Sequence, residues 1–264
     1  MKLLFIGDIV GQIGRDTLKT YLPKLKERFK PQLTVANAEN AANGKGITEK
    51  IYKDLLQSGV DMMTMGNHVW DNSDIFQFID HANKLVRPAN LSTHVPGVGY
   101  RLVKVNQITL AIVNLQGQVF MNSSNNPFEV AQTLLEEIRE HTSHIFVDFH
   151  AEVTSEKQAM GWFLDGKVSA VVGTHTHVQT NDARILPQGT AYLSDVGMTG
   201  AYDGILGLKR DGIINRFQTQ LPTRHEVMDN GRYLLSACLI EIDDATGKAK
   251  SIQNIMINED KPFI

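Results

Sequence analysis

Short apolar runs alternate with amphipathic helical segments through the first two-thirds of the chain. The runs expected to form buried strands are Leu3–Ile6, Leu33–Ala36, Met62–Met65, Ile145–Phe149 and Ala170–Val172. The segments with helical periodicity are Asp16–Phe29, Thr48–Gln57, Ser73–Ile79, Pro127–Glu140 and Glu156–Phe163. This alternation predicts an α/β fold in which helices cover the outer faces of β-sheets.

The remaining segments of the chain are mostly strand-like. A hairpin is expected from Leu102–Val105 and Thr109–Val113, and Thr48 has the residue type of a helix N-cap. Pro23 is expected near the start of its helix or at a kink. The last third should contain one helix, Gly212–Phe217, and the strands Ala191–Ser194, Glu226–Met228, Leu234–Ile242 and Ser251–Ile257. Because no linker interrupts the pattern, we expect one domain over residues 1–264.

Composition excludes several classes of protein. Apolar residues make up 42% of the chain, which is enough for an ordinary core, and the net charge of −3 does not favour nonspecific nucleic-acid binding. The lone Cys238 lies in an apolar run, so we expect a buried side chain and neither a disulfide framework nor a thiolate metal site. No apolar run is long enough to span a membrane, and the N-terminal run is too short for a signal peptide. A cytoplasmic location is the resulting expectation.

A side chain that can bind a metal ion follows each of the five buried runs. Parallel strands of an α/β sheet line the ligand site with their carboxyl ends, so these side chains should meet in one place. The candidate ligands are Asp8, Glu39, Asn40, Asn67, His150, His175 and His177.

His175 and His177 form the most informative pair. In extended backbone their side chains would point to the same side and reach one centre. The mixture of imidazole, carboxylate and amide donors favours iron, manganese or zinc. Seven donors exceed the needs of one ion, and two ions that share a carboxylate account for the number.

Several sequence blocks resemble those of calcineurin-like metallophosphoesterases. The match is to the YmdB-like phosphodiesterase branch, and it includes FIGDIVG, NAENAANGKG, MGNHVWD, RPAN, DFHAE, MGW, VVGTHTHVQT and DVGMTG, in that order. Val10 and Glu39 stand where the wider superfamily has histidine and aspartate, which is typical of this branch and puts ordinary phosphomonoesterase activity in doubt.

The resemblance implies a fold, a ligand arrangement and an activity. The fold would be a two-sheet sandwich flanked by helices in four αββα layers. Asp8 and His177 would hold one ion, Glu39 would bridge, and the second ion would be held by Asn40, Asn67, His150 and His175. Iron is the first choice of metal, with manganese or zinc as alternatives. The implied activity is hydrolysis of 2′,3′-cyclic nucleotides, and homo-oligomers are common in the branch.

The expected mechanism is attack on phosphorus by a hydroxide that the two metal ions generate. The leaving oxygen then needs a proton, and His68 is the candidate donor because it neighbours Asn67. The alternative role for His68 is to orient a metal ligand. Asp148 could orient a histidine or could be an ordinary buried acid.

Two other functions compete with this interpretation. The first is a phosphomonoesterase or nucleotidase that uses the same metals. The second is a metal-stabilised regulatory or RNA-associated protein with little catalysis, although the charge does not indicate RNA binding. The expected partners are therefore a small phosphodiester or nucleotide, no membrane, and a second copy of the chain if it forms an oligomer.

Overall fold

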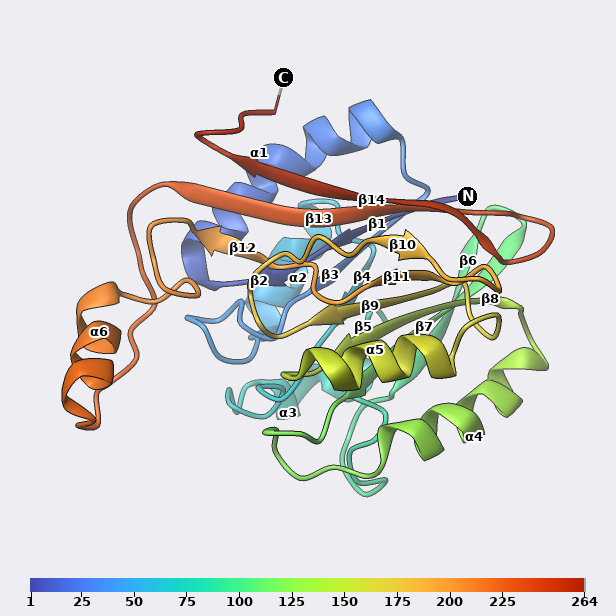
Figure 1. Cartoon of the computed structure of the whole chain (residues 1–264), viewed down its shortest axis with the longest axis horizontal. Helices are drawn as coiled ribbons and strands as arrows, with labels where there is room; N and C mark the ends of the chain where they lie inside the picture. Colours follow the sequence, from blue (N-terminus) through green and yellow to red (C-terminus); the bar gives the residue numbers. More distant parts are fainter. Residues whose placement is uncertain (264) are drawn as a thin grey trace.

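The computed structural model describes residues 1–263 and consists of two β-sheets packed face to face, with helices on both outer faces (Figure 1). The first sheet has eight strands in the order β2-β12-β13-β1-β3-β4-β5, and β14 pairs with β13. Its strands are β1 (Lys2–Ile6), β2 (Asp8–Ile9), β3 (Leu33–Asn37), β4 (Met62–Thr64), β5 (Leu85–Val86), β12 (Met198–Ala201), β13 (Tyr233–Ile242) and β14 (Ala249–Asn258). The predicted α/β sandwich flanked by helices is confirmed.

The second sheet has six strands in the order β10-β11-β9-β8-β7-β6. Its strands are β6 (Tyr100–Val105), β7 (Ile108–Gln116), β8 (His144–His150), β9 (Ala170–Thr174), β10 (Arg184–Ile185) and β11 (Ala191–Leu193). Adjacent strands in the middle of each sheet pair in parallel: β1 with β3 and β3 with β4 in the first sheet, and β7 with β8 and β8 with β9 in the second. Their carboxyl ends therefore face the same side of the molecule.

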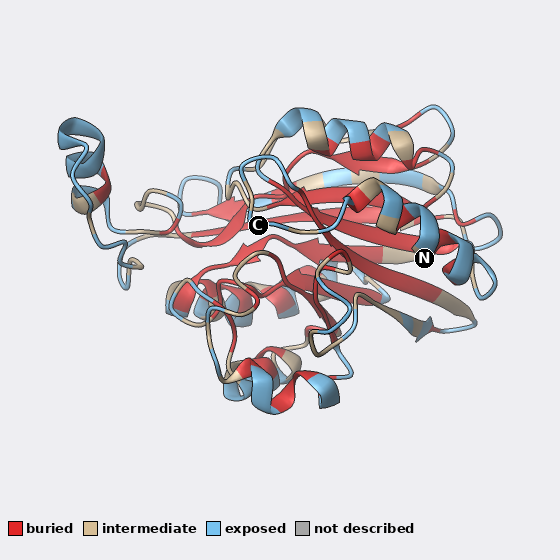
Figure 2. Cartoon of the chain, turned by 90° about the horizontal axis from the view of Figure 1, so that it is seen from below, coloured by how far each residue is buried: buried red, intermediate tan, exposed pale blue. Residues whose placement is uncertain are grey.

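Three layers of apolar side chains hold the sandwich together, and Figure 2 shows the buried residues concentrated in the strands and on the inner faces of the helices. Between the sheets, Phe5 packs on Phe146 with ring centroids 5.1 Å apart. Cys238 lies fully buried in this layer, as predicted. The first sheet is covered by α1 (Gly11–Phe29), α2 (Glu49–Gln57), α3 (Ile75–Phe78) and the 3₁₀ turn η1 (Ile79–His81), and the second by α4 (Pro127–Arg139) and α5 (Thr154–Phe163).

Local sequence signals explain some helix boundaries and miss others. The Thr48 cap is confirmed, because its Oγ1 accepts a hydrogen bond from the Ile51 N–H at 3.2 Å. The predicted start of α1 at Asp16 is wrong: the helix begins at Gly11, so Pro23 lies in its middle, at an exposed position. Packing of the buried face of α1 against the sheet outweighs the one backbone hydrogen bond that Pro23 cannot donate.

An arm formed by residues 202–232 projects from the sandwich between β12 and β13 and carries α6 (Arg210–Thr219) (Figures 1 and 2). The predicted helix is confirmed there. The strand predicted at Glu226–Met228 is wrong, because Val227 makes only an isolated bridge with Leu208 and no sheet lies beside it. Within residues 1–263, no helix is both long enough and apolar enough to cross a membrane.

Candidate metal centre

Side chains from the carboxyl ends of both sheets meet at one point. Asp8 lies in β2, Glu39 and Asn40 follow β3, and Asn67 follows β4. From the second sheet, His150 ends β8, and His175 and His177 follow β9. The seven predicted ligands form one cluster because the two sheets pack face to face with these strand ends on the same side.

The inner half of the cluster surrounds the His150 ring. Its Nε2 lies 2.9 Å from Asn67 Oδ1, 2.9 Å from Glu39 Oε1 and 3.0 Å from His175 Nδ1. One ring nitrogen carries at most one proton and cannot satisfy three such neighbours, whereas a cation between them could. A side chain on Gly66 would place its Cβ 2.4 Å from both Glu39 Oε2 and His150 Nε2, so the close approach of this loop requires glycine.

The outer half consists of Asp8, Asn40 and His177. Asp8 Oδ1 lies 3.9 Å from His177 Nε2, and Asn40 Nδ2 lies 3.3 Å from the same nitrogen. Asp8 Oδ2 accepts a hydrogen bond from the His175 N–H, but Oδ1 is buried and has no hydrogen-bond partner. A buried carboxylate oxygen without a partner is costly unless it binds a cation. Asn40 thus lies beside His177, whereas the family resemblance groups it with the His150 ligands.

In each of the three cluster histidines, the ring nitrogen that points away from the cluster lies beside a hydrogen-bond acceptor. The pairs are His150 Nδ1 with Thr174 Oγ1 at 2.9 Å, His175 Nε2 with Glu152 Oε2 at 3.0 Å, and His177 Nδ1 with Leu206 O at 3.0 Å. These bonds place a proton on the ring nitrogen that points away from the cluster, so the nitrogen that faces the cluster is the one that can offer its lone pair to a metal ion. The tautomers are those that metal coordination needs, and the residues fit a pair of metal ions.

Asp148 continues one of these hydrogen-bond chains. The Thr174 hydroxyl donates to Asp148 Oδ1 at 2.7 Å, so it accepts from the His150 ring. Asn37 Nδ2 donates to the other Asp148 oxygen at 3.1 Å. Asp148 therefore orients His150 through Thr174, which is one of the two roles that the sequence allowed.

The loop that carries His175 and His177 is not extended, and that part of the sequence argument is wrong. Both residues have positive φ, 103° for His175 and 63° for His177. They converge because Asp195 holds the residue between them. Its Oδ2 accepts from the Thr176 N–H at 3.0 Å, from the Thr176 hydroxyl at 2.7 Å, and from the buried Lys157 ammonium at 2.7 Å. A buried ion pair thus fixes the loop in a conformation that side chains other than glycine rarely adopt.

Burial and contacts between neighbouring side chains shift the pKa values of two residues in the cluster. Burial opposes the charge of Glu39, but His150 and the His68 N–H stabilise the carboxylate and lower its pKa to about 2. Burial likewise opposes charge on His150, while Glu39 and Asp8 raise the pKa of its imidazole to about 9. Without metal, the two form an ion pair, and a metal ion would have to displace the His150 proton.

Three other groups near the cluster favour the neutral state. Burial, followed by the neighbouring His150, lowers the pKa of His175 to about 3. Burial raises the pKa of Asp148 to about 7, against the opposing influence of His150 and two hydroxyl hydrogen bonds. Burial also raises the pKa of Asp8, although His177 and His150 counteract it. A second cation near Asp8 would restore the stability of its carboxylate form.

His68 lies at the edge of the cluster, and its ring contacts Asp71 instead of the candidate ligands. Its backbone N–H donates to Glu39 Oε2 at 2.9 Å, and its Nδ1 lies 2.8 Å from Asp71 Oδ2. Lys45 Nζ lies 3.4 Å from the same Asp71 oxygen. His68 lines a cavity of about 360 Å³ that also contains Glu39, His175 and His177, so its ring is accessible from the space beside the cluster.

Several residues that support the site were not among the candidates predicted from the sequence. Asp71, three residues after His68, has the spacing of a turn contact that could have pointed to a partner for the ring. Asp195 lies in the DVGMTG block, but nothing local in the sequence connects it to Thr176. In the segment after β8, Glu152 contacts His175 and Lys157 pairs with Asp195, and their tertiary contacts identify them as supports of the site.

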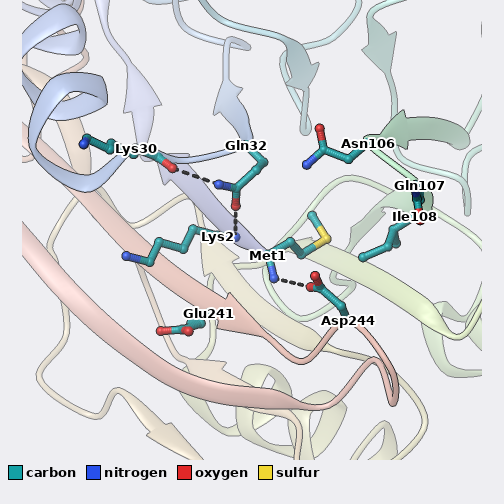
Figure 3. A pocket seen from close by; sticks show the side chains of 9 residues that line it. All are labelled: Met1, Lys2, Lys30, Gln32, Asn106, Gln107, Ile108, Glu241 and Asp244. Carbon is teal, nitrogen blue, oxygen red and sulfur yellow. Dashed lines mark hydrogen bonds and ion pairs between the residues drawn. The ribbon is translucent and has the colours of Figure 1, made fainter.

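A larger cavity, of about 790 Å³, lies at the opposite end of the sheets (Figure 3). It is lined by polar and charged residues near the amino ends of β1 and β3, including Lys2, Gln32 and Asp244. The N-terminal amine forms an ion pair with Asp244, and the Gln32 side chain accepts from the Lys2 N–H at 2.5 Å. The residues that line the larger cavity include no histidine, whereas Glu39, His175 and His177 line the smaller cavity, so we assign the chemistry to the smaller cavity.

The two-sheet fold and this cluster define a protein of the metallophosphoesterase class. The chain belongs to the YmdB-like protein family, whose model matches residues 4–255. It is 57% identical, over 100% of its length and 99% of the relative's, to a 2′,3′-cyclic-nucleotide 2′-phosphodiesterase of Bacillus subtilis (strain 168).

Two solved structures share the whole fold. A crystal structure of a novel phosphatase of Mycoplasma pneumoniae has a TM-score of 0.93 at 36% identity, and the match covers 99% of this chain and 95% of that one. A hypothetical protein from Thermus thermophilus has a TM-score of 0.92 at 37% identity, over 98% of this chain and 100% of that one.

Proposed function

We propose that this protein is a metal-dependent phosphodiesterase that hydrolyses 2′,3′-cyclic nucleotides. The observation that carries the proposal is the inward orientation of three histidine nitrogens toward buried carboxylate and amide oxygens, one of which has no other partner. The 57% identity to the Bacillus subtilis enzyme over the full chain supports this substrate class.

We assign the seven ligands to two metal positions. The outer position would be held by Asp8, Asn40 and His177, the inner one by Asn67, His150 and His175, and Glu39 would be shared between them. Asn40 is assigned to the outer position because its side chain contacts His177. Iron is our first choice, with manganese or zinc as alternatives, since the donors are oxygen and imidazole nitrogen. When bound, the ions would lower the pKa of a water molecule and neutralise charge on the phosphoryl oxygens.

The protein's own groups would then complete the reaction. Asp71 holds the His68 ring through its Nδ1, so the other ring nitrogen, Nε2, would be the one that gives a proton to the leaving oxygen of the substrate. Lys45 contributes positive charge at the rim of the cavity, where an anionic substrate would enter. Asp148, Glu152 and the Leu206 carbonyl would hold the histidine rings in their orientations.

The test is a comparison of two substrates on protein of known metal content. The metal-loaded protein should hydrolyse adenosine 2′,3′-cyclic monophosphate faster than p-nitrophenyl phosphate. Faster turnover of the monoester would favour the phosphomonoesterase alternative. Inertness toward both would favour a metal-stabilised regulatory protein, although the open cavity beside the cluster argues against a purely structural site, which closes its coordination shell.

Four expectations from the sequence stay predictions. They are the single domain over residues 1–264, the cytoplasmic location, assembly into a homo-oligomer, and an RNA association that the charge does not indicate. Size-exclusion chromatography with light scattering would test the oligomer directly.

A further inference from the structure

A strained turn lies at the base of the arm, between β12 and α6 (Figure 1). Ile205 and Leu208 exchange two backbone hydrogen bonds, each of 2.9 Å, which makes a tight two-residue hairpin. The two central residues, Leu206 and Gly207, have φ of 53° and 83°. A turn with both central residues at positive φ strongly favours asparagine or aspartate followed by glycine. A leucine at the first position is unfavourable there, and such strain is concentrated at functional sites.

The turn contacts the metal cluster through its backbone. The Leu206 carbonyl accepts the hydrogen bond from His177 Nδ1 at 3.0 Å. This contact explains the need for the turn, but it does not explain the leucine side chain, because any residue supplies a carbonyl. The side chain is 43% exposed and lines the same cavity as His68, His175 and His177.

Leu206 belongs to an apolar wall of that cavity. The wall also includes Leu208, Val227 and Val10. Val227 packs against the buried cluster of Val10, Met198 and Leu234, so the wall is anchored to the sandwich. Polar residues occupy the other sides, among them Lys45, Glu152 and His225. An apolar surface next to a site for a phosphate anion suits a ligand with a charged end and a flat, weakly polar end.

We propose that the Leu206 turn binds the nucleobase of the substrate. This inference rests on the proposed function and adds the part of the substrate that the metal ligands do not recognise. With the phosphate at the cluster, the base would lie against Leu206 and Leu208, which exclude water from one of its faces. The strained leucine would then serve substrate selection, and the carbonyl of the same residue would orient His177.

Leu206→Gly tests the role of the side chain. Glycine adopts positive φ without strain, so the turn and its carbonyl should persist, and the melting temperature should stay equal or rise. We compare kcat/KM for adenosine 2′,3′-cyclic monophosphate with kcat/KM for the base-free methyl riboside 2′,3′-cyclic phosphate. The preference for the nucleotide should fall roughly 10-fold, mainly through a higher KM. Leu208→Ala should also reduce the preference for the nucleotide.

The matched control is Leu221→Gly, because Leu221 is an exposed leucine of the arm that does not line the cavity. Its nucleotide preference should equal that of the wild type. The inference is overturned if Leu206→Gly retains its metals and keeps the full preference, or if the wild type has no preference for the substrate that carries a base.

A binding measurement separates failure of this inference from failure of the proposed function. Calorimetric titration with adenosine 3′-monophosphate should show a Kd roughly 10-fold higher for Leu206→Gly than for the wild type. The Kd for inorganic phosphate should be the same for Leu206→Gly and for the wild type. A wild-type protein that binds the nucleotide but hydrolyses no diester would contradict the proposed function alone. Equal nucleotide Kd values for variant and wild type would contradict base binding alone.

Discussion

Two parts of the candidate metal site, His150 and the loop that carries His175 and His177, are held in different ways. His150 ends a central strand, is fully buried, and is oriented by the buried Thr174 and Asp148. His177 lies in a positive-φ loop, is 13% exposed, and is oriented by a carbonyl of the arm. The sheet itself supplies the geometry of His150, whereas His175 and His177 depend on the Lys157–Asp195 ion pair that anchors Thr176, and His177 depends also on the Leu206 turn. We therefore expect His150 to tolerate loss of its supporting contacts better than the two loop histidines.

Glu39 tests whether the two halves form one site. Glu39→Ala should empty at least one metal position, because its carboxylate contacts His150 and the neighbouring Asn40. Metal analysis of protein purified without added metal measures the effect, and activity should be lost with the metal. Glu241→Ala, at the larger cavity, is the control with full metal content. Wild-type metal content in Glu39→Ala would remove Glu39 as the shared ligand.

His68 tests whether proton donation is separate from metal binding. His68→Ala should keep nearly all of the metal and lower turnover by roughly 10²–10⁴-fold on a diester with a poor leaving group. The loss should be smaller on a diester whose leaving group needs no proton. His141→Ala, at an exposed position after α4, is the matched control. Loss of metal from the His68 variant would instead indicate the role of a residue that orients a ligand.

The Lys157–Asp195 pair tests how far the two loop histidines, His175 and His177, depend on the contacts that support their loop. Asp195→Ala should lower metal affinity by roughly 10–100-fold, since Thr176 and with it His175 and His177 would lose their anchor. A chelator competition titration measures this. The double variant Lys157→Met/Asp195→Ala avoids an unpaired buried ammonium and should show the same loss.

The control for that prediction is Asp165→Ala. Asp165 is also buried, but it holds the backbone N–H groups of Gln188 and Thr190, away from the cluster. Its removal should lower the melting temperature without changing metal affinity. Wild-type affinity in the Lys157–Asp195 double variant would show that the loop holds its conformation without the ion pair. A matched Thr174→Val variant, at the inner half, should lose less affinity than Asp195→Ala if the sheet positions His150.

The pH dependence of the metal-free protein should show the smallest effect. The folded-state pKa of His150 is raised from 6.5 to about 9, so its stabilisation is complete below pH 6.5 and is lost as pH rises through about 9. The pKa of Asp148 is raised from 3.8 to about 7, so its protonated form also stabilises the folded state, and this stabilisation is lost as pH rises through about 7. The pKa of Glu39 is lowered to about 2, so its carboxylate stays ionised throughout this range and its contribution to the free energy of unfolding does not change with pH.

Urea unfolding at pH 6.5 and pH 9 measures this difference. The free energy of unfolding of the metal-free protein should be lower at pH 9, and bound metal should abolish the decrease because it replaces the His150 proton. A metal-free protein that is more stable at pH 9 would contradict the ion pair between His150 and Glu39.

Local sequence determined the larger elements and the list of candidate ligands. β1, β3, α2 with its Thr48 cap, and β8 with its terminal His150 follow from apolar periodicity and capping, which act between residues close in the chain. The short strands β2, β5, β10 and β12 escaped prediction because two to four residues carry no periodic signal. They form because neighbouring strands offer hydrogen-bond partners, as β13 does for β12.

Tertiary structure alone decided how the side chains of the candidate ligands are oriented. The residue types of Asp8, Glu39, His150 and His177 predict a metal site, but extended backbone was the wrong reason for bringing His175 and His177 together. Their conformation is imposed by Asp195, 19 residues after Thr176, and the His177 tautomer by Leu206, 29 residues after it. Hydrogen-bond geometry between distant segments exists only once the sheets have packed, so no local pattern in the sequence could encode it.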